Sequence, residues 1–389
     1  MAAHTLANPP YAQRAGRYVR QPAGYAAFIP APLPPDPLPD MTMALVESLS
    51  AAALALGRLD GAALTLPNAD LFVGMYVRQE AVLSSRIEGT QASLTDVLQF
   101  QVDEAAERPR DVREVVNYVD AMNHGLARLA DLPLSLRLVR EIHARLLDGV
   151  RGSAREPGEF RRSQNWIGPP GATIRSATFV PPPAHEVMNA MGALEGFWYE
   201  RSFAPLVRAG LSHAQFETIH PFLDGNGRVG RLLVTFMLCQ EGVLHRPLLY
   251  LSHFFKEHRA DYYARLQAVR DEGRWEEWLA FFLRGVREVA ASATETAWAI
   301  VRLRQAHVGL LSRLRAPGNL LRLLDLLFEQ PVVTVTYVRD RLGLPYPTAS
   351  SLIGRMVDLG LLVESTGHRR NRRFVYLSYV ELFEPTDNR

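Results

Sequence analysis

The segment of the chain with the most potential chemistry is HPFLDGNGRVGR, at residues 220–231. Pro221 disfavours helical backbone in the residue before it, so we expect His220 at the end of a helix, where its imidazole can serve as a base. The glycines on either side of Asn226 predict a tight turn whose backbone N–H groups point into a shared concavity. Arg228 starts the next predicted helix, and a helix N-terminus favours phosphate through its free N–H groups and its dipole.

Three charged side chains complete this segment. Arg228 and Arg231 are three residues apart, so they share one face of the predicted helix and can both reach a polyphosphate. Asp224 is a hard oxygen ligand beside that phosphate site, which suits a Mg²⁺ ion that bridges phosphates. A base, a metal carboxylate and a phosphate cradle are the parts that nucleotidyl or phosphoryl transfer requires. The alternative, a glycine-containing loop with ordinary surface arginines, leaves most of these positions without a chemical reason.

The segment resembles the core motif of the Fic (Fido-domain) family, HPFx[DE]GNGRxxR, at every defined position. The resemblance implies that His220 deprotonates the Ser, Thr or Tyr hydroxyl of a protein substrate, and that the oxygen attacks the α-phosphate of ATP and releases pyrophosphate. It implies that Asp224 holds Mg²⁺. It also implies that residues 225–227 form an anion hole and that Arg228 and Arg231 hold the β- and γ-phosphates. The candidate nucleotide-binding residues of this run are Gly225, Asn226, Gly227, Arg228, Val229, Gly230 and Arg231.

Other positions extend the resemblance. A related branch of Doc-like kinases carries Lys in place of the second glycine, and Gly227 argues against that branch. HAQFETIH, at 213–220, is similar to the helix that leads into the motif, which places Gln215 near the nucleotide. DYYARLQAVRDEG, at 261–273, is similar to the helix on the adenine side, and Tyr263 is the candidate for packing on the base. An aromatic residue at that spacing could equally be plain core.

A second motif lies upstream, in SSRIEGT at residues 84–90. Ser84 and Glu88 are four residues apart, so they share one face near the end of a predicted helix, and Gly89 follows as a glycine that ends helices. The segment is similar to the family's inhibitory pattern [ST]xxxE[GN]. The resemblance implies that Glu88 pairs with Arg231, so that ATP binds in an unproductive pose. Taken alone, a glutamate before a terminal glycine is a common helix ending.

Helical periodicity dominates the regions that must position these residues, so we expect a mainly α fold with a β-hairpin flap and a C-terminal winged helix-turn-helix. Helices are expected at 185–199, 204–219, 228–240, 259–271, 275–291 and 293–315. The flap is expected at 161–183. The resemblance implies that its part around 164–179 clamps the target segment by strand addition. The expected division is a Pro-rich arm (1–40), a helical region with the inhibitory helix (41–135), the Fido catalytic domain (136–286), a linker helix (287–316) and the winged helix (317–389).

The winged-helix prediction depends on three amphipathic stretches followed by a hairpin. The stretches are NLLRLLDLLFEQ, VTVTYVRDRLG and TASSLIGRMVDLGLLVES, the last opened by the cap candidate Thr348. RRNRR, at 369–373, would form a basic wing before the final strand FVYLS. From 317 to 389 there are nine Arg against eight Asp plus Glu, so this part is nearly neutral. DNA and protein both remain open as its partner.

Composition excludes several classes. Hydrophobic residues make up 48% and charged residues 22%, as in ordinary globular proteins, and a net charge of +2 confines any nucleic-acid surface to a local patch. Cys239 is the single cysteine, which excludes an intramolecular disulfide and a cysteine-based zinc cluster. The N-terminus lacks a signal-peptide pattern and no apolar run has the length of a membrane span, so we expect a cytoplasmic protein without a membrane partner.

The sequence therefore predicts an autoinhibited protein adenylyltransferase that uses ATP and Mg²⁺ and modifies a hydroxyl side chain of a target protein or of itself. Three alternatives remain. The same pocket could remove AMP, with Glu88 positioning a water. The transferred group could be another phosphate-linked group, such as UMP or phosphocholine. The chain could be a DNA-binding regulator whose Fido domain senses nucleotide. Apolar helices on both sides of the core suit a homodimer or a buried interface within the chain.

Overall fold

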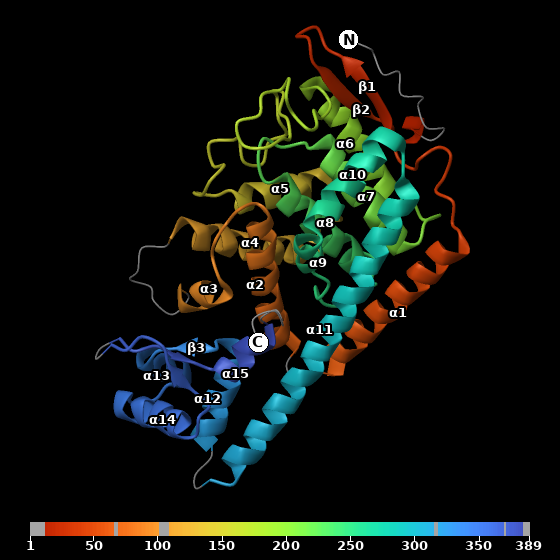
Figure 1. The fold of residues 1–389 in the computed structure, drawn as a ribbon. Coiled ribbons are helices and arrows are strands. Elements are labelled where there is room, and N and C mark those ends of the chain that lie inside the picture. The colour runs from red at the N-terminus through yellow and green to blue at the C-terminus, as the bar shows by residue number, and fades with distance from the viewer. Residues whose placement is uncertain (1–11, 66–68, 101–108, 315–317, 369–370, 384–389) are drawn as a thin grey trace. The chain divides into compact units, whose positions relative to one another are not determined.

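The computed structural model describes residues 12–65, 69–100, 109–314, 318–368 and 371–383 (Figure 1). Residues 1–11 of the predicted arm and Arg369 and Arg370 of the predicted wing therefore lie outside the described residues. The chain forms two compact units: unit 1 comprises residues 1–57 and 117–290, and unit 2 comprises residues 58–116 and 291–389. In the described part of the chain, no helix has the length and apolar character that a bilayer crossing requires.

Unit 1 is built around two helices that are buried on almost every side. In α7 (Pro205–Ile219) all residues after the first are buried, and α8 (Asn226–Gln240) is buried without interruption from Arg228 to Leu238. Such all-round burial is typical of a central helix rather than an amphipathic surface helix. The other helices with residues in unit 1 are α1 (Met43–Thr65), α4 (Arg110–Arg128), α5 (Leu136–Leu146), α6 (Ala184–Trp198), α9 (Ser252–Glu257), α10 (Arg259–Glu272) and α11 (Trp275–Ser312).

The predicted N-terminal arm contains regular structure. After the 3₁₀ turn η1 (Ala12–Arg14), strands β1 (Gly16–Arg20) and β2 (Ala26–Pro30) form an antiparallel hairpin in which Gly16 pairs with Pro30. Gly16 has φ 136°, and a Cβ atom there would lie 2.2 Å from the carbonyl oxygen of Ile29. Only glycine can therefore occupy this position without moving the hairpin.

The predicted flap at 161–183 is not a regular hairpin. All of its residues are described, and it holds a single antiparallel bridge, between Ile167 and Phe179. Prolines in its tip and in its second leg supply no N–H donors, so a longer ladder cannot form. The second leg instead joins the N-terminal hairpin, because the N–H of Phe28 in β2 donates to the carbonyl oxygen of Val180 at 2.9 Å.

Unit 2 contains the helix with the regulatory motif, α2 (Ala69–Ile87), the short α3 (Leu94–Phe100), and the C-terminal elements. Its three short strands form an antiparallel sheet in the order β3-β5-β4. The rings of Phe328, Tyr376 and Tyr379 pack against one another in its core. The C-terminal elements are α12 (Gly318–Glu329), β3 (Val332–Val333), α13 (Val335–Leu342), α14 (Tyr346–Asp358), β4 (Val363–Glu364), β5 (Phe374–Val375), α15 (Leu377–Val380) and the 3₁₀ turn η2 (Glu381–Phe383).

The two helices expected at 275–291 and 293–315 are wrong, because α11 runs unbroken from Trp275 to Ser312. The sequence AASATETA around the expected break contains neither Gly nor Pro, so nothing there ends a helix. Likewise α1 continues through Gly61 to Thr65, although glycine is typical of helix ends. One glycine costs a helix only about 1 kcal/mol, which tertiary packing overrides.

Two smaller expectations in the C-terminal region are also wrong. Thr348 does not cap α14: the helix begins at Tyr346, with Pro345 at the N-cap and Pro347 in the first turn. Proline is tolerated there because the first N–H groups of a helix have no partner inside it. The expected final strand FVYLS is a strand only at Phe374–Val375, and the chain then turns into α15.

Candidate active site

His220 lies at the C-cap of α7, so the prediction that Pro221 places it at a helix end is confirmed. Its backbone is left-handed, with φ 48° and ψ 62°, and its N–H donates to the carbonyl oxygen of Phe216 at 2.9 Å. A residue with a Cβ atom rarely adopts this conformation, which must be supported by its surroundings. This conformation ends α7 and begins the loop that leads to α8.

Two flap residues hold this loop, and the sequence analysis missed both. Arg161 is almost fully buried, with 2% of its surface exposed, and its Nε donates to the carbonyl oxygen of His220 at 2.9 Å. Asn165 donates through Nδ2 to the carbonyl oxygens of Phe222, at 2.9 Å, and His220, at 3.5 Å. No motif marks these residues, because their acceptors are backbone atoms that any sequence supplies.

The turn before α8 is closed by the side chain of Asn226. Its Oδ1 accepts from the N–H of Phe222 and its Nδ2 donates to the carbonyl oxygen of the same residue, both at 2.8 Å. Gly225, with φ 78°, is the N-cap and has no side chain to bond the first N–H groups of the helix. The backbone N–H groups of Asn226 and Gly227 are therefore capped by no side chain within the described residues, as an anion hole requires. The helix starts at Asn226, two residues before the expected start at Arg228.

Asp224 is the partly exposed acid of the loop. Its Oδ1 accepts from the N–H of Gly225 at 2.6 Å and lies 3.5 Å from Nη2 of Arg228. A Cβ atom on Gly152 would come within 3.1 Å of Oδ2, so the loop around Gly152 closes over the carboxylate. Among the described residues, no group of three or more His, Cys, Asp or Glu could hold a metal. A single carboxylate beside a phosphate site fits Mg²⁺, which commonly takes one or two carboxylates and completes its shell with phosphates and water.

His143, on α5, positions this acid and was also missed by the sequence analysis. Its Nδ1 accepts from the N–H of Gly158 at 2.8 Å, so the ring proton is on Nε2, which donates to the carbonyl oxygen of Asp224 at 3.0 Å. The ring stacks on Phe222 with centroids 3.7 Å apart. Burial, helped by the nearby charge of Arg228, lowers the pKa of His143 to about 4, so the neutral form is fixed at physiological pH.

The two arginines of the motif lie one turn apart in α8, and both are buried. Arg228 is fully buried, and 5% of Arg231 is exposed. Val229 is also fully buried, and Gly230 lets α8 approach α7, because a Cβ atom there would lie 2.7 Å from Oε1 of Glu217. Direct nucleotide contacts by Arg228, Arg231, Val229 and Gly230 stay predictions.

The two residues outside the motif that are expected near the nucleotide, Gln215 and Tyr263, differ in exposure. Gln215 is buried on α7, and its Nε2 donates to the carbonyl oxygen of Ala31, just after β2, at 2.8 Å. Tyr263 on α10 is 44% exposed, so the alternative that it belongs to the core is wrong. Its neighbour Tyr262 is the core residue, and its hydroxyl pairs with Nε2 of buried His213 at 2.9 Å. The contacts of Gln215 and Tyr263 with a nucleotide stay predictions.

The regulatory residues lie in unit 2, at the end of α2. Ser84 is fully buried, Glu88 is partly exposed, and Gly89 has φ 99°. The N–H of Gly89 donates to the carbonyl oxygen of Arg86 and the N–H of Thr90 to that of Ser85, both at 3.1 Å. This pair of bonds is the Schellman motif, which needs the left-handed glycine and fixes Glu88 at the C-terminal end of the helix.

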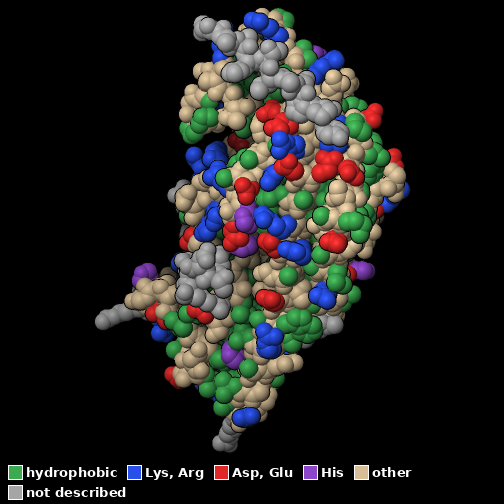
Figure 2. Space-filling view, turned by 45° about the vertical axis from the view of Figure 1, so that its right-hand side comes forward, with side chains coloured by type: hydrophobic (Ala, Val, Ile, Leu, Met, Phe, Trp, Pro, Cys, Tyr) green, Lys and Arg blue, Asp and Glu red, His purple; other side chains and the backbone are tan. Residues whose placement is uncertain are grey.

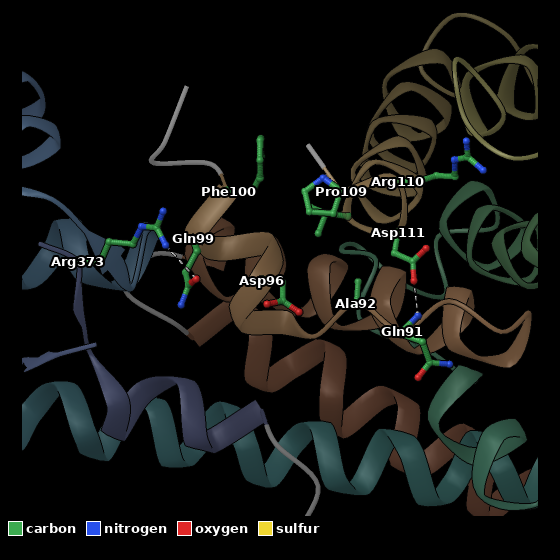
Figure 3. Close-up of a pocket in the computed structure, with 10 residues that line it drawn as sticks. Gln91, Ala92, Asp96, Gln99, Phe100, Pro109, Arg110, Asp111 and Arg373 are labelled. Atoms are coloured by element: carbon green, nitrogen blue, oxygen red, sulfur yellow. Dashed lines mark hydrogen bonds between the residues drawn. The ribbon is translucent and has the colours of Figure 1, made fainter. Parts of the chain in front are cut away.

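The segment that follows Glu88 borders a pocket of about 500 Å³ within unit 2 (Figure 3). Two bonds organise its wall: the N–H of Gln91 donates to Oδ2 of Asp111 at 2.8 Å, and Nη1 of Arg373 donates to Oε1 of Gln99 at 3.3 Å. The pocket contains none of the predicted catalytic residues.

Comparisons with known proteins agree with this geometry. Residues 46–127 match the family model described as Fic/DOC family N-terminal, and residues 133–238 match the model described as Fic/DOC family. The protein adenylyltransferase Fic of Aedes aegypti is 31% identical over 195 residues, which cover 48% of this chain and 36% of the relative. A probable protein adenylyltransferase of Aquifex aeolicus (strain VF5) is 30% identical over 181 residues, covering 45% of this chain and 51% of that protein. The chain thus matches about a third to about a half of the length of these relatives.

The same family appears among solved structures. A Fic family protein from Desulfovibrio desulfuricans G20 superposes with a TM-score of 0.56 at 20% identity, covering 87% of this chain and 97% of that one. At this identity the likeness concerns the fold. Together with the two family models and the intact motif, it shows that the chain belongs to the Fic/DOC family. The relatives named above carry the name of one activity, protein adenylyl transfer.

Proposed function

We propose that this chain is a protein adenylyltransferase that transfers AMP from ATP to a Ser, Thr or Tyr hydroxyl of a target protein or of itself. The observation that carries the proposal is the meeting of a left-handed His220 with the glycine-capped start of α8. A base and an anion hole at the two ends of one short loop are the arrangement that attack on a phosphate needs.

In the proposed reaction, His220 takes the proton of the target hydroxyl while its oxygen bonds to the α-phosphorus. The bond from that phosphorus to the bridging oxygen breaks, and pyrophosphate leaves. The N–H groups of Asn226 and Gly227 face the charge that develops on the phosphoryl oxygens, and the short loop keeps them close to the base. Arg228 and Arg231 hold the β- and γ-phosphates.

Asp224 is the residue that would hold Mg²⁺. The ion neutralises charge on the phosphates when bound. The chain's own contribution is the direction of the carboxylate. The N–H of Gly225 donates to Oδ1 of the carboxylate, and the neutral ring of His143 donates to the backbone carbonyl oxygen of Asp224 and so holds its main chain. Aimed in this way, the acid needs no reorganisation when the nucleotide enters.

The proposal includes autoinhibition by Glu88. The Schellman ending holds its carboxylate at the C-terminus of α2, where the helix dipole is negative. A cation would relieve this conflict, and Arg231 is the proposed partner. A paired Arg231 cannot hold the γ-phosphate, so ATP would bind in an unproductive pose. The buried Ser84 lies one turn earlier on the same helix face.

The test is labelling with ATP carrying ³²P at the α-position, with Mg²⁺, followed by gel autoradiography. We expect little label on the wild type, strong self-labelling or target labelling with Glu88→Gly and Glu88→Gln, and none with Glu88→Gly/His220→Ala. Glu88→Gln is the matched variant, because it removes the charge and keeps the shape. Equal labelling of wild type and both Glu88 variants refutes the autoinhibition, and labelling that survives loss of His220 refutes the assigned base. Incubation of labelled target with unlabelled protein tests AMP removal in the same assay.

We also propose that residues 318–383 form a winged helix-turn-helix, supported by the order of three helices and a three-stranded antiparallel sheet. Several of its arginines already have partners: Arg341 pairs with Glu329 at 2.5 Å and Arg339 with Asp340 at 2.7 Å. Basic and acidic side chains are interspersed over the middle of the face shown in Figure 2. Residues 317–389 themselves contain nine Arg against eight Asp plus Glu. These observations favour a protein partner over DNA. Fluorescence anisotropy with a mixed DNA duplex at low salt tests this, and micromolar binding that weakens steeply with salt would restore the DNA-binding alternative.

A further inference from the structure

We propose that Arg161 is a positioning residue for the transfer reaction, because its guanidinium holds His220 in the left-handed conformation and fastens both legs of the flap to it. The inference depends on the proposed function, in which His220 is the base. Arg161 itself lies outside the twelve-residue motif and is assigned no contact with ATP.

The contacts of Arg161 converge on three separate parts of the chain. Besides the bond from Nε to His220, Nη2 donates to the carbonyl oxygens of Pro182, at 2.6 Å, and Ile219, at 3.3 Å. Nη1 donates to the carbonyl oxygen of Ser163 at 3.2 Å. Ser163 and Pro182 belong to the two legs of the flap, so one planar group joins the flap to the end of α7.

The main chain of Arg161 adds a further bond to the same loop. Its N–H donates to the carbonyl oxygen of Pro221 at 2.9 Å. Three successive carbonyl oxygens, those of Ile219, His220 and Pro221, therefore accept from this one residue. Because those carbonyls lie at the end of a helix, the helix itself cannot satisfy them, and their direction follows the donors that Arg161 provides.

The chemistry requires an arginine at this position. Guanidinium presents several N–H donors in one plane, whereas lysine offers three donors from a single point and no other side chain offers as many. The partners of the side chain named above are neutral carbonyl groups, and burial lowers the pKa of Arg161 to about 10. A cation is thus kept in a buried place for its hydrogen-bond geometry, although desolvation opposes it.

The functional consequence follows from the backbone of His220. If the side-chain donors are removed, the carbonyl oxygen of Ile219 loses its bond from Arg161 and that of His220 keeps only the longer bond from Asn165. The left-handed residue can then relax towards ordinary helical or extended backbone. Either change swings the imidazole away from the hydroxyl it must deprotonate. A displacement of about 1 Å at a reacting group can cost about 100-fold in rate. The α-phosphate site on α8 does not depend on Arg161, so nucleotide affinity should hold.

A purely structural role predicts something different. Such a residue would lower stability when replaced, and the folded fraction would then react at the parent rate. The discriminating measurements are therefore the turnover number of folded protein, its nucleotide affinity, and the state of the His220 ring.

The experiment uses the full chain with Glu88→Gly as the parent, and adds Arg161→Gln, Arg161→Lys or the control Arg162→Gln, whose neighbouring side chain is exposed. Labelling rates are measured over a range of ATP concentrations, ATP affinity by calorimetry, and folding by thermal denaturation. We expect Arg161→Gln to lower kcat about 100-fold with the Kd for ATP changed less than threefold. Arg161→Lys should recover part of the rate, and Arg162→Gln should match the parent.

A kcat within threefold of the parent for folded Arg161→Gln overturns the inference. If Arg161→Gln does not fold, Arg161→Lys and Asn165→Ala decide. Asn165 also donates to the carbonyl oxygen of His220, and an unchanged kcat in both variants overturns the proposal.

If the folded parent itself transfers no AMP, the proposed function has failed. The positioning role is then judged from the ¹⁵N-histidine signals of His220, identified by their loss in His220→Ala. Signals that shift in Arg161→Lys and stay in Arg162→Gln support it, and signals that stay in both overturn it.

Discussion

Gly125 in α4 offers a sharp test of the packing that holds α8. It is buried, and a Cβ atom built on it would lie 2.4 Å from Cζ of Phe236 and 2.7 Å from Cε1 of the same ring. Phe236 is fully buried on α8, the helix that begins at Asn226. Carbon atoms attract one another best at about 3.5–4.0 Å, so the added methyl group would overlap the ring by more than 1 Å or force it to move.

The magnitude of Gly125→Ala is the difference between two terms. Replacing glycine by alanine inside a helix normally stabilises by about 1 kcal/mol. Overpacking a closed core costs about 1–3 kcal/mol, and the rigid ring places the cost near the upper end. We therefore expect the free energy of unfolding to fall by about 1–2 kcal/mol. Because Phe236 shares a helix with the proposed phosphate site, labelling in the Glu88→Gly background should fall as well.

The matched control is Gly192→Ala in α6, where a Cβ atom would meet nothing within 4 Å. The same exchange there should stabilise by about 0.5–1 kcal/mol, so the two variants should change stability in opposite directions. Urea denaturation followed by circular dichroism measures both, and equal m-values keep the comparison valid. The reasoning is refuted if Gly125→Ala is as stable as the wild type or more so.

Three further predictions concern the site. Asn226→Ala removes both bonds to Phe222 and leaves buried polar atoms, so unfolding free energy should fall by about 2–4 kcal/mol, while exposed Asn123→Ala should change it little; equal urea midpoints would contradict this. Burial lowers the pKa of His213 to about 4, below its unfolded value of about 6.5. The unfolded chain then binds the proton first, so stability is full above about pH 6.5 and falls towards pH 4, by about 3 kcal/mol in all. His213→Asn should flatten that part of the pH–stability curve, and parallel curves would show that His213 does not cause the loss. Tyr263→Ala should leave stability nearly unchanged, since the ring is 44% exposed, but weaken ATP binding about tenfold by calorimetry if the ring stacks on the base. An unchanged Kd removes Tyr263 from the site.

The sequence predicted the features that short-range chemistry determines. Pro221 acts on its immediate neighbour, and Gly225 allows a left-handed N-cap, so the ends of α7 and α8 could be placed to within two residues. Gly89 ended α2 for the same local reason. The residue types and spacing of the motif at 220–231 were then enough to identify the family.

Features that depend on distant parts of the chain could not be predicted. Arg161 and His143 matter because they reach backbone atoms about 60–80 residues away, and no spacing rule connects a side chain to a carbonyl group. The flap failed as a hairpin because its second leg pairs with β2, a strand that the Pro-rich composition of the arm concealed. Which neighbouring strand the edge of a strand bonds to is therefore seen only in the folded structure.

The flap is fastened only at its base, which leaves its tip free to vary in sequence. Its legs are fixed at their base by Arg161, by the bridge between Ile167 and Phe179, and by the bond from Phe28 to Val180. The tip between the legs, residues 168–178, is largely exposed and touches none of these fastenings except at its ends. Tip residues can therefore be inserted, deleted or exchanged while the catalytic loop keeps its geometry. Under the proposed function, with the flap clamping the target as expected, the tip is therefore the place to graft a new target preference.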